Sequence, residues 1–520
     1  MATSRSDSSS LRKDGPPFPR LLVANRGEIA VRIIRACREL GIESVATYSD
    51  ADADALHTRM ADFAEPIGPA PAAESYLSID AVIAAAARSG AAAIHPGYGF
   101  LSENAAFARA VEDAGIVFVG PPPTTLESLG DKLAARRSVA AAGVPIVPGL
   151  LVPLVADQGG SVSAVDLSEV GYPAMIKAAA GGGGRGMRQV ADRAELEAAL
   201  PGAGREALAA FGDGTLYLER LISPARHVEV QLLGDRHGNL AVLGERECSV
   251  QRRHQKLVEE SPSPAVDPGL RAELTESARR VAGTVAFHSA ATVEFLVDAD
   301  GDHYFLEMNT RLQVEHGVTE LVTGLDLVAW QIRVAAGEHL SGAVLASAPL
   351  GHAIEARLYA EDPHQHFAPV SGTVTTWRMP DGPGIRVDAG VTADTRLPVE
   401  YDPLLAKVMV HAEDRPAAVA RLRRALEETA IGGVQTDLSF LRWLVGQPAF
   451  LTGSYDTGLI PDEWGDGPGL TDEERSMAAE VARGARGSAP PLSAAAVSDP
   501  APSAWEAVAR REAVGRRRPR

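Results

Sequence analysis

Short apolar runs alternate with amphipathic stretches in the first part of the chain. The run LLVA begins at Leu21, a polar turn NRGE follows, and IAVRIIRACREL then places apolar residues at helical spacing up to Gly41. The next apolar run, SVATYSD, starts at Ser44, and the alternation continues to about Gly120. Alternating strands and helices of this kind predict an α/β domain built on a parallel sheet.

Further along, the pattern separates into several units. A predicted helix, GDKLAARRSVAAAG, ends at Gly143, and the predicted strands YPAMIKAAA and MRQV then enclose a glycine loop. Beyond Tyr217 the pattern is rich in strands, and RPAAVARLRRALEET predicts a late helix. The expected fold class combines α/β and α+β parts. The expected ranges are a disordered tail at 1–19, an N-terminal α/β domain at 20–131, a central region at 132–333 with its smaller unit at about 148–220, a C-terminal domain at 334–465 and a flexible tail at 466–520.

Composition narrows the classes of function. A length of 520 residues predicts about two to four compact units, and the net charge of −18 argues against nucleic acid as a partner. Two cysteines, Cys37 and Cys248, cannot build a disulfide framework and favour a reducing compartment. No apolar run is long enough to span a membrane, and the first residues lack the apolar segment of a secretory signal. We therefore expect a cytoplasmic protein with no membrane partner.

A glycine loop, GGGGRG, spans Gly181–Gly186 and formally matches G-x-G-x-x-G. A dinucleotide-binding loop of that pattern lies between a strand and a helix, whereas strand-like sequence flanks this loop on both sides. A loop between two strands is typical of a flap whose backbone N–H groups fold over phosphates, and Lys177 just before it supplies a cation. The alternative is a surface hairpin without a ligand.

Two glutamates face each other in a predicted hairpin. In ATVEFLVDADGDHYFLEMNTR, Asp300-Gly301 is a two-residue turn signal that would place Glu294 directly opposite Glu307. Opposed like charges are unfavourable unless a cation joins them, and Asn309 lies on the same face as Glu307. Two carboxylates and an amide oxygen suit Mg²⁺ with nucleotide phosphates. One buried and one exposed acid without metal is the alternative.

The segment RLQVEH follows this hairpin directly. If it is extended, Arg311, Gln313 and Glu315 share one face, where a cation, an amide and a carboxylate could hold a small anion and remove its proton. A salt-bridged surface strand is the alternative.

Further polar positions carry weaker signals. The cationic run RRHQK ends at Lys256 and predicts either a solvated loop or a loop that binds phosphate or bicarbonate. We expect Cys248 nearby to be a buried thiol and Cys37 to lie in a helix core. His95 and Tyr98 follow an apolar strand in HPGYGFLSEN, where they either line a ligand crevice or pack at a tight turn.

Taken together, these motifs resemble a known family. The segments ANRGEIAVRIIRAC, HPGYGFLSEN, GDK, IKAAAGGGGRGM, RHVEVQ, ERECSVQRRHQKLVEESP and EMNTRLQVEH occur in the order found in biotin carboxylases, and the resemblance covers about residues 20–465. It implies the ATP-grasp fold, with an N-terminal α/β domain, a mobile lid and a C-terminal biotin carboxylase domain. It also implies ATP, Mg²⁺ or Mn²⁺ and bicarbonate as ligands.

Matching positions imply the sites for ATP and the metal. Lys132 and Lys177 would contact ATP phosphates, and Gly183 and Gly184 of the lid would close over them. Magnesium would be held by Glu294, Glu307 and Asn309, as the hairpin also suggests. The remaining nucleotide contacts would come from the linker Glu219, Arg220, Leu221 and Ile222, from His227 near the ribose, and from His254, which with Lys256 would also serve the bicarbonate-derived anion.

The resemblance also implies the chemistry. Glu315 would deprotonate bicarbonate, which Arg311, Gln313 and the backbone of Val314 would position for attack on the γ-phosphate of ATP. The resulting carboxyphosphate would release CO₂ and phosphate, and the phosphate would take the ureido proton of biotin. Arg357 would stabilise the biotin enolate, and Tyr98 would shape the biotin pocket.

Two positions differ from the commonest pattern of the family. Gly317 stands where proline often follows Glu-His, and we expect it to loosen the loop behind Glu315. Pro403 follows Asp402 where serine is frequent, and we expect a changed contact near biotin or at a subunit interface.

The expected partners are a separate biotin carrier protein and a carboxyltransferase subunit, because the sequence contains no Met-Lys-Met motif of a carrier domain. The resemblance further implies a homodimer that carries out the first half-reaction of an acyl-CoA carboxylase-type complex. Two alternatives stay open: another ATP-grasp ligase such as carbamoyl phosphate synthase, and a non-catalytic nucleotide-binding scaffold subunit.

Overall fold

The computed structural model describes residues 15–155, 170–179 and 187–464. These residues belong to one compact unit, Met1–Gly467, while a second unit, Pro468–Arg520, lies outside the described residues. The predicted C-terminal tail and most of the predicted N-terminal tail also fall outside them. The same holds for Gly183 and Gly184 of the glycine loop.

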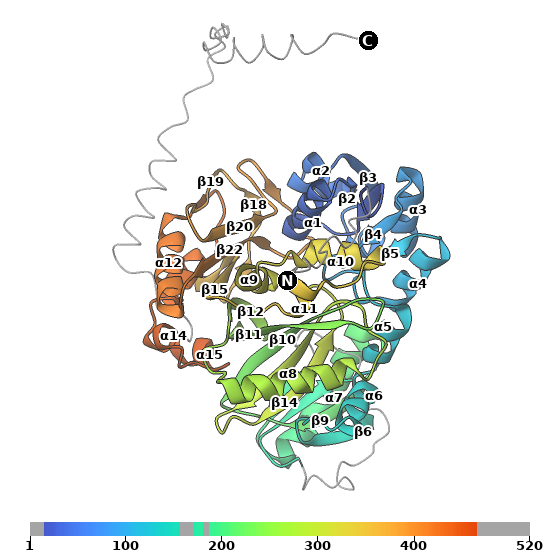
Figure 1. The fold of residues 1–520 in the computed structure, drawn as a ribbon. Helices are drawn as coiled ribbons and strands as arrows, with labels where there is room; N and C mark the ends of the chain where they lie inside the picture. Colours follow the sequence, from blue (N-terminus) through green and yellow to red (C-terminus); the bar gives the residue numbers. More distant parts are fainter. Residues whose placement is uncertain (1–14, 156–169, 180–186, 465–520) are drawn as a thin grey trace, which may run out of the picture. The chain divides into compact units, whose positions relative to one another are not determined.

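The N-terminal part is a five-stranded parallel sheet in the order β3-β2-β1-β4-β5 with helices around it (Figure 1). This confirms the predicted α/β alternation. The strand order reverses between β1 and β4, and loops at such a point form a ligand crevice in α/β sheets. The elements are β1 Arg20–Val23, α1 Gly27–Glu39, β2 Glu43–Ser49, α2 Leu56–Met60, β3 Phe63–Gly68, α3 Ile79–Ser89, β4 Ala93–His95, α4 Ala105–Asp113, β5 Val117–Phe118, α5 Pro123–Gly130 and α6 Lys132–Ala141.

Local sequence fixes where several of these helices begin. The side chains of Ser78, Asn104 and Asp131 accept backbone N–H bonds at the starts of α3, α4 and α6, which satisfies donors that a helix leaves open. The cap at Asp131 makes Lys132 the first residue of α6.

A smaller antiparallel sheet follows, in the order β6-β9-β7-β8. Its strands β7 and β8 pair with each other on the two sides of residues 180–186, so the predicted strands that flank the glycine segment are confirmed, while the segment itself lies outside the described residues. The elements are β6 Gly149–Val155, β7 Ala174–Ala178, β8 Arg188–Val190, α7 Arg193–Phe211 and β9 Thr215–Arg220.

The largest sheet has eight antiparallel strands in the order β14-β13-β10-β11-β12-β15-β22-β20. It joins strands that are far apart in sequence: the paired residues of β12 and β15 are more than 90 positions apart, and those of β15 and β22 are 45 to 60 positions apart. Its strands are β10 Ala225–Gly234, β11 Leu240–Arg252, β12 Gln255–Ser261, β13 Ser289–Asp298, β14 His303–Asn309, β15 His352–Tyr359, β20 Ile385–Ala389 and β22 Leu404–Ala412.

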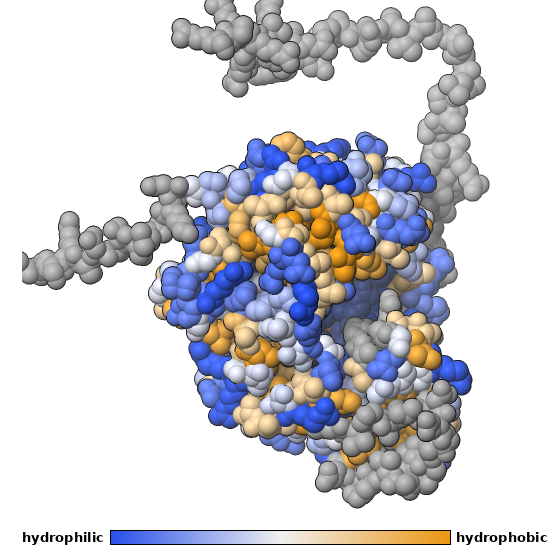
Figure 2. All heavy atoms as spheres, turned by 90° about the vertical axis from the view of Figure 1, so that its right-hand side faces the viewer, coloured by the Kyte–Doolittle hydropathy of each residue, from blue (hydrophilic) through white to orange (hydrophobic). Residues whose placement is uncertain are grey.

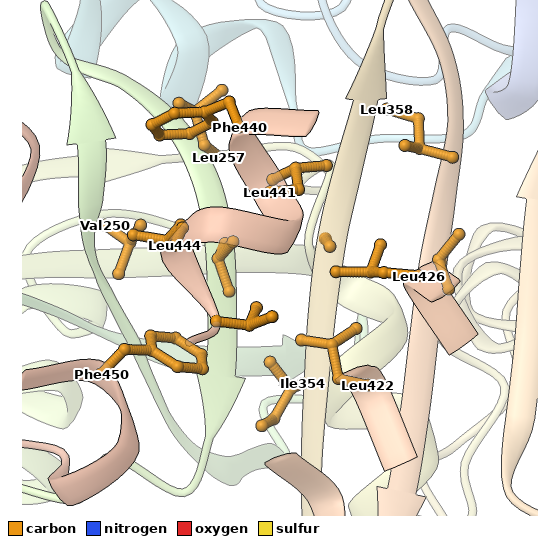
Figure 3. Packing of buried hydrophobic residues seen from close by; sticks show 14 of the residues in the cluster. Val250, Leu257, Ile354, Leu358, Leu422, Leu426, Phe440, Leu441, Leu444 and Phe450 are labelled. Carbon is orange, nitrogen blue, oxygen red and sulfur yellow. The ribbon is translucent and has the colours of Figure 1, made fainter. Parts of the chain in front are cut away.

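The two faces of this sheet differ in chemistry. Along β22, Ala406, Val408 and Val410 enter an apolar core with the helices α12 (Arg415–Glu428) and α13 (Leu438–Leu444), while Lys407 and Met409 point to the opposite face. Figure 3 shows Leu422, Leu441 and other residues of this core packed between the helices and the strands. The opposite face carries charged side chains and is called the polar face below.

Further helices and several short strands complete the described fold. Among the described residues, no helix combines the length and apolar character that a membrane crossing requires. Figure 2 shows apolar patches on one face of the molecule interrupted by hydrophilic side chains. The remaining elements are α8 Pro268–Ala282, α9 His316–Thr323, α10 Leu327–Ala335, α11 Gly342–Leu345, β16 Glu361–Asp362, β17 Ala368–Pro369, β18 Gly372–Thr373, β19 Thr376–Arg378, β21 Arg396–Leu397, α12 Arg415–Glu428, β23 Ala430–Gly432, α13 Leu438–Leu444, α14 Pro448–Thr452 and α15 Leu459–Glu463.

Candidate active site

Six adjacent strands bring charged side chains together on the polar face. Neighbouring strands lie close enough for their side chains to touch, so a row across the sheet becomes one connected network. The row consists of Glu307 and Asn309 from β14, Glu294 from β13, His227 and Glu229 from β10, Arg246 from β11, Lys256 from β12 and Arg357 from β15.

The predicted pairing of two glutamates is present, although the predicted turn is wrong. Glu294 lies opposite Glu307, but the hairpin closes through the backbone of Asp298 and Asp302 (N···O 3.0 Å), which encloses a three-residue loop. Such a loop alone would shift the pairing by one residue. A bulge between Glu294 and the following residue, with Leu306 as the extra residue on β14, compensates for the shift.

Cations and amide groups surround this acidic pair. Lys132 Nζ lies 3.2 Å from Glu307, and His227 Nε2 lies 2.7 Å from Glu294. The amide nitrogen of Asn309 donates to Glu294 (2.8 Å) and to Glu307 (3.3 Å). Burial alone would raise the pKa of both carboxyls, but Lys132 lowers the pKa of Glu307, and Lys256 and His227 lower that of Glu294.

The donor set fits a magnesium ion. Glu294 and Glu307 offer hard carboxylate oxygens, and lysine ammonium groups already balance their charge in place of a metal. A half-turn of the Asn309 amide would present its oxygen to the same position, at the cost of the bond that Arg311 donates to that oxygen.

Lys256 is the hub of the network. Its ammonium contacts Glu229 at 2.7 Å, Glu294 at 3.1 Å and Glu315 at 2.7 Å, so three carboxylates share one cation. Although burial opposes a charged lysine, the nearby acidic groups raise the pKa of Lys256 well above its ordinary value. The side chain of Arg246, which is fully buried, neutralises Glu229 from the other side.

The segment after β14 does not have the extended conformation considered above, but its side chains still reach the network. Residues 311–315 form a bend and a turn rather than an extended strand, and Glu315 directly precedes α9. Arg311 donates to the side chain of Gln313 (2.8 Å), and Gln313 donates to Glu294 (3.0 Å). Arg311 also pairs with Glu103 at 2.9 Å, which links the site to the N-terminal part. The three predicted side chains therefore converge without strand alternation.

Glu315 lies between two cations. One carboxylate oxygen is 2.7 Å from Lys256 Nζ, and the other accepts from Arg357 Nη2 at 2.9 Å. Burial would raise the pKa of Glu315, but Lys256 and Arg357 hold it well below its ordinary value. Arg357 is also paired with Glu259, whose pKa burial raises to about 7. The Glu315 side chain is thus ionised and almost fully enclosed.

The predicted cationic run forms a strained turn. Arg253 and His254 occupy the two central positions between β11 and β12, with φ of +49° and +68°. Glycine or asparagine is usual at such positions, and strain of this kind concentrates at functional sites. Partial desolvation and the nearby charge of Lys177 lower the pKa of His254, so this ring is neutral.

Two of the residues predicted to contact the nucleotide, Lys177 and Glu219, belong to a buried ion-pair cluster. Glu219 bridges Lys177 (2.6 Å) and Arg136 (2.7 Å), and the Glu219 side chain is only 2 % exposed. The linker residues Arg220, Leu221 and Ile222 follow at the end of β9, where the Leu221 N–H donates to the backbone of the β7 edge (2.9 Å).

Tyr98 reaches a second part of the network. The side chain of Asn25 donates to the carbonyl of Tyr98 (2.7 Å) and so holds its loop against the loop that follows β1. The Tyr98 hydroxyl donates to Glu28, and Glu28 pairs with Lys407 at 3.2 Å. Lys407 in turn donates to the carbonyl of Val314 at 2.6 Å. His95 is buried as well, and its desolvation lowers its pKa to about 3.

The cysteines lie where we expected them. Cys248 is fully buried on β11, and desolvation raises its pKa well above the ordinary value. Cys37 is buried in α1, where desolvation raises its pKa to about 12. Neither thiol is therefore a thiolate at neutral pH.

The expectation for Gly317 is wrong. Gly317 lies in the first turn of α9, and a Cβ there would overlap the sulfur of Met409. The glycine therefore permits close packing behind Glu315 rather than a loose loop.

Sequence reasoning missed several charged residues of the network. Glu229 in HVEVQLL and Lys407 in LLAKVMV are each a single charge within an apolar strand run, and this signal could have identified them. The other missed residues are Arg246 in VLGERECSV, Glu259 in KLVEES and Glu355 in HAIEARLY, which have further charges beside them and therefore lack that signal.

Family models match three parts of the chain. Residues 17–126 match the model described as "Biotin carboxylase, N-terminal domain", and residues 355–462 match "Biotin carboxylase C-terminal domain". The intervening residues 131–343 match "Carbamoyl-phosphate synthase L chain, ATP binding domain". The two outer matches distinguish biotin carboxylases from the alternative of a carbamoyl phosphate synthase.

Individual relatives give the same result. A biotin carboxylase of Halalkalibacterium halodurans is 48 % identical over 85 % of the chain and 97 % of its own length. The methylcrotonoyl-CoA carboxylase subunit alpha of Rattus norvegicus is 46 % identical over 87 % of the chain, which spans 63 % of that relative.

Solved structures also match. The biotin carboxylase of Campylobacter jejuni superimposes with a TM-score of 0.82 at 43 % identity, covering 86 % of the chain and 99 % of that structure. The biotin carboxylase domain dimer of the 2-oxoglutarate carboxylase of Hydrogenobacter thermophilus, described with MgADP, ADP and bicarbonate, gives 0.82 at 44 % identity over 86 % of the chain and 97 % of that structure.

Proposed function

The chain belongs to the biotin carboxylase family and has its ATP-grasp fold, and on this premise we propose that it uses ATP and bicarbonate to carboxylate biotin on a carrier protein. It is an ATP-dependent ligase. The observation that carries the assignment of roles is the enclosure of Glu315 between Lys256 and Arg357, next to the acidic pair on β13 and β14.

Glu315 is the base that we assign to bicarbonate. At neutral pH it is ionised, since Lys256 and Arg357 lower its pKa, but a base with so low a pKa accepts protons poorly. An anionic substrate that draws Lys256 away would raise the pKa of Glu315 toward a useful range. Bicarbonate and phosphate oxygens would therefore create the base as they bind.

Arg311 and Gln313 are placed to orient the bicarbonate. Their side chains contact each other, Gln313 also donates to Glu294 of the acidic pair, and Lys407 holds the Val314 backbone between Gln313 and Glu315. Arg357, on the other side of Glu315, would stabilise the negative charge that develops on the biotin ring.

Lys132 and Lys177 would neutralise ATP phosphates, and Glu294, Glu307 and Asn309 would hold magnesium. A bound magnesium ion supplies charge neutralisation to the phosphates during transfer. The residues implied for the nucleotide, from Glu219 to Ile222 with His227 and His254, together with Gly183 and Gly184, remain assignments by resemblance.

We also propose a homodimer that works with a biotin carrier protein and a carboxyltransferase. The solved relative from Hydrogenobacter thermophilus is described as a domain dimer, and relatives include subunits of acyl-CoA carboxylases. The cytoplasmic location remains a prediction.

ATP hydrolysis that depends on bicarbonate and rises with free biotin tests this function. Glu315→Gln keeps the shape of the side chain and should abolish the bicarbonate-dependent rate. Glu273→Gln is the matched control, because this glutamate on α8 is 67 % exposed. Turnover that is independent of bicarbonate, or unaffected by biotin, would contradict the proposal.

A further inference from the structure

Lys407 is a fully buried lysine to which the roles assigned above give no contact with a substrate. It lies on β22, where the neighbouring residues in sequence are apolar. Its ammonium lies 2.6 Å from the Val314 carbonyl and 3.2 Å from the Glu28 carboxylate. Val314 immediately precedes Glu315, whereas Glu28 belongs to the first turn of α1 in the N-terminal part. One ammonium therefore connects the backbone beside the base with helix α1 of the N-terminal part.

Glu28 extends this connection to Tyr98. The oxygen of Glu28 that faces Lys407 also accepts the Tyr98 hydroxyl, and the other oxygen has no partner among the described residues. Tyr98, Glu28, Lys407 and Val314 form a continuous chain of contacts. One end is the proposed biotin pocket, and the other end is next to the proposed bicarbonate base.

Because of the charges around Lys407, its position depends on what happens at both ends of this series of contacts. Across the sheet, Lys407 lies directly opposite Arg357 on β15, and two like charges in a buried ladder repel each other. The acidic groups that balance Lys407 are Glu28, Glu355 on β15 and Asp388 on β20. Arg386, also on β20, adds a further positive charge to this group.

Glu28 is poorly stabilised as an anion. Burial raises its pKa and Asp388 raises it further, while Lys407 and the Tyr98 hydroxyl oppose the shift. A ligand that turned the Tyr98 hydroxyl away would take a donor from Glu28. Lys407 would then be drawn toward Glu28 and away from the Val314 carbonyl, because the charge of Glu28 would lack other compensation.

We propose that Lys407 is a positioning residue that couples occupancy of the biotin pocket at Tyr98 to the placement of Glu315. This inference rests on the proposed function, since it needs Tyr98 beside biotin and Glu315 beside bicarbonate. It assigns a physical route by which biotin accelerates the step that consumes ATP.

The quantity to measure is the stimulation factor, defined as ATP turnover with bicarbonate and saturating biotin divided by turnover with bicarbonate alone. The full-length protein is compared with Lys407→Met, Glu28→Gln and the double variant Glu28→Gln/Lys407→Met. The double variant removes both charges, so it folds without the unpaired buried charge that Lys407→Met leaves.

Arg415→Met is the matched control. Arg415 forms an ion pair with the buried Glu260 at 2.7 Å and is itself only 13 % exposed, but it has no contact with the series from Tyr98 to Val314. A purely structural role for Lys407 predicts the same outcome for both methionine variants.

We expect the stimulation factor to fall about tenfold or more in Lys407→Met, in Glu28→Gln and in the double variant, as expected for a lost coupling between two sites. In Arg415→Met the thermal midpoint should fall while the stimulation factor stays at the wild-type value. The biotin concentration for half-maximal stimulation should change less than the maximal stimulation, because Lys407 does not touch biotin.

A wild-type stimulation factor in Glu28→Gln and in the double variant would overturn the inference, whether or not Lys407→Met folds. An equal fall in Arg415→Met would overturn it too, since loss of stability would then be sufficient. If the wild-type protein itself shows no bicarbonate-dependent turnover, the proposed function fails instead.

Discussion

Replacing Lys256 with methionine removes an ammonium that three buried carboxylates share. Glu229 and Glu315 each lie 2.7 Å from this ammonium and Glu294 lies 3.1 Å from it, and their side chains are at most 5 % exposed. Methionine keeps the length of the side chain, so the change is close to a pure loss of charge.

Breaking a buried ion pair by removing one partner costs about 3–5 kcal/mol. Each carboxylate keeps one other partner of opposite or partial positive charge: Arg246 for Glu229, Arg357 for Glu315 and His227 for Glu294. We therefore expect the lower end of that range, a loss of about 3 kcal/mol in the free energy of unfolding.

The loss should depend on pH. Lys256 keeps the pKa values of Glu294 and Glu315 below their ordinary value of 4.5, and such groups stabilise the fold above that pH and lose this effect as pH falls. Without Lys256 their pKa values rise, and protonation removes the uncompensated charge. The difference between wild type and variant should be complete at about pH 8 and smaller at about pH 3, because the stabilisation by these groups is lost as the pH falls below 4.5.

Urea unfolding followed by circular dichroism measures the effect at both pH values. Lys132→Met is the matched control, because its ion pair with Glu307 is about one-third exposed (side chains 28 % and 34 %) and is expected to contribute under about 1 kcal/mol. An equal loss in both variants, or a loss in Lys256→Met that does not change with pH, would refute the reasoning.

Three further substitutions have defined outcomes. Glu259→Gln should raise the free energy of unfolding by about 3 kcal/mol at about pH 8 and leave it unchanged at about pH 4. The reason is that burial raises the pKa of Glu259 from 4.5 to about 7, so the ionised carboxylate destabilises the fold above this range. If the urea midpoints of wild type and variant were equal at both pH values, this prediction would be contradicted. Gly317→Ala should cost about 1–3 kcal/mol through overlap with the Met409 sulfur, and Met409→Val in the same chain should restore most of the thermal midpoint, whereas no rescue would point to another cause. Arg253→Asn should gain about 1 kcal/mol in a thermal melt, since asparagine tolerates the φ of +49° better, and a lower midpoint would show that the arginine side chain outweighs the strain.

Local pattern was sufficient for elements that neighbouring residues determine. The N-terminal alternation of strands and helices follows from hydrophobic periodicity, so β1, α1 and β2 lie where LLVA, IAVRIIRACREL and SVATYSD predict them. The pairing of Glu294 with Glu307 was right for an incomplete reason. The three-residue turn and the bulge at Leu306 each shift the register by one residue in opposite senses, and neither is visible in the alternation.

Long-range pairing could not be predicted in this way. The contact of Lys407 with Glu28 joins the large sheet to helix α1 of the N-terminal part, and Arg357 faces Lys407 only because β15 pairs with β22. A periodicity indicates which face a residue occupies, but not which distant strand supplies its neighbour. The bend at 311–315 could not be predicted from the alternation of residues either, because the chain continues after Glu315 as helix α9 and not as a strand.

Two like-charged pairs divide the polar face into an acidic and a basic end. Glu294 opposes Glu307 on β13 and β14, and Arg357 opposes Lys407 on β15 and β22. Neither pair would be stable alone in a buried sheet, so each is balanced by opposite charges from neighbouring side chains. A metal ion bound at the acidic end would compete with the lysine ammonium groups for the two carboxylates. An anion bound near the basic end would attract the ammonium groups that lose their carboxylate partners. The two kinds of ligand that the reaction needs would therefore each reduce the electrostatic cost of binding the other, with Lys256 as the charge that both exchanges share.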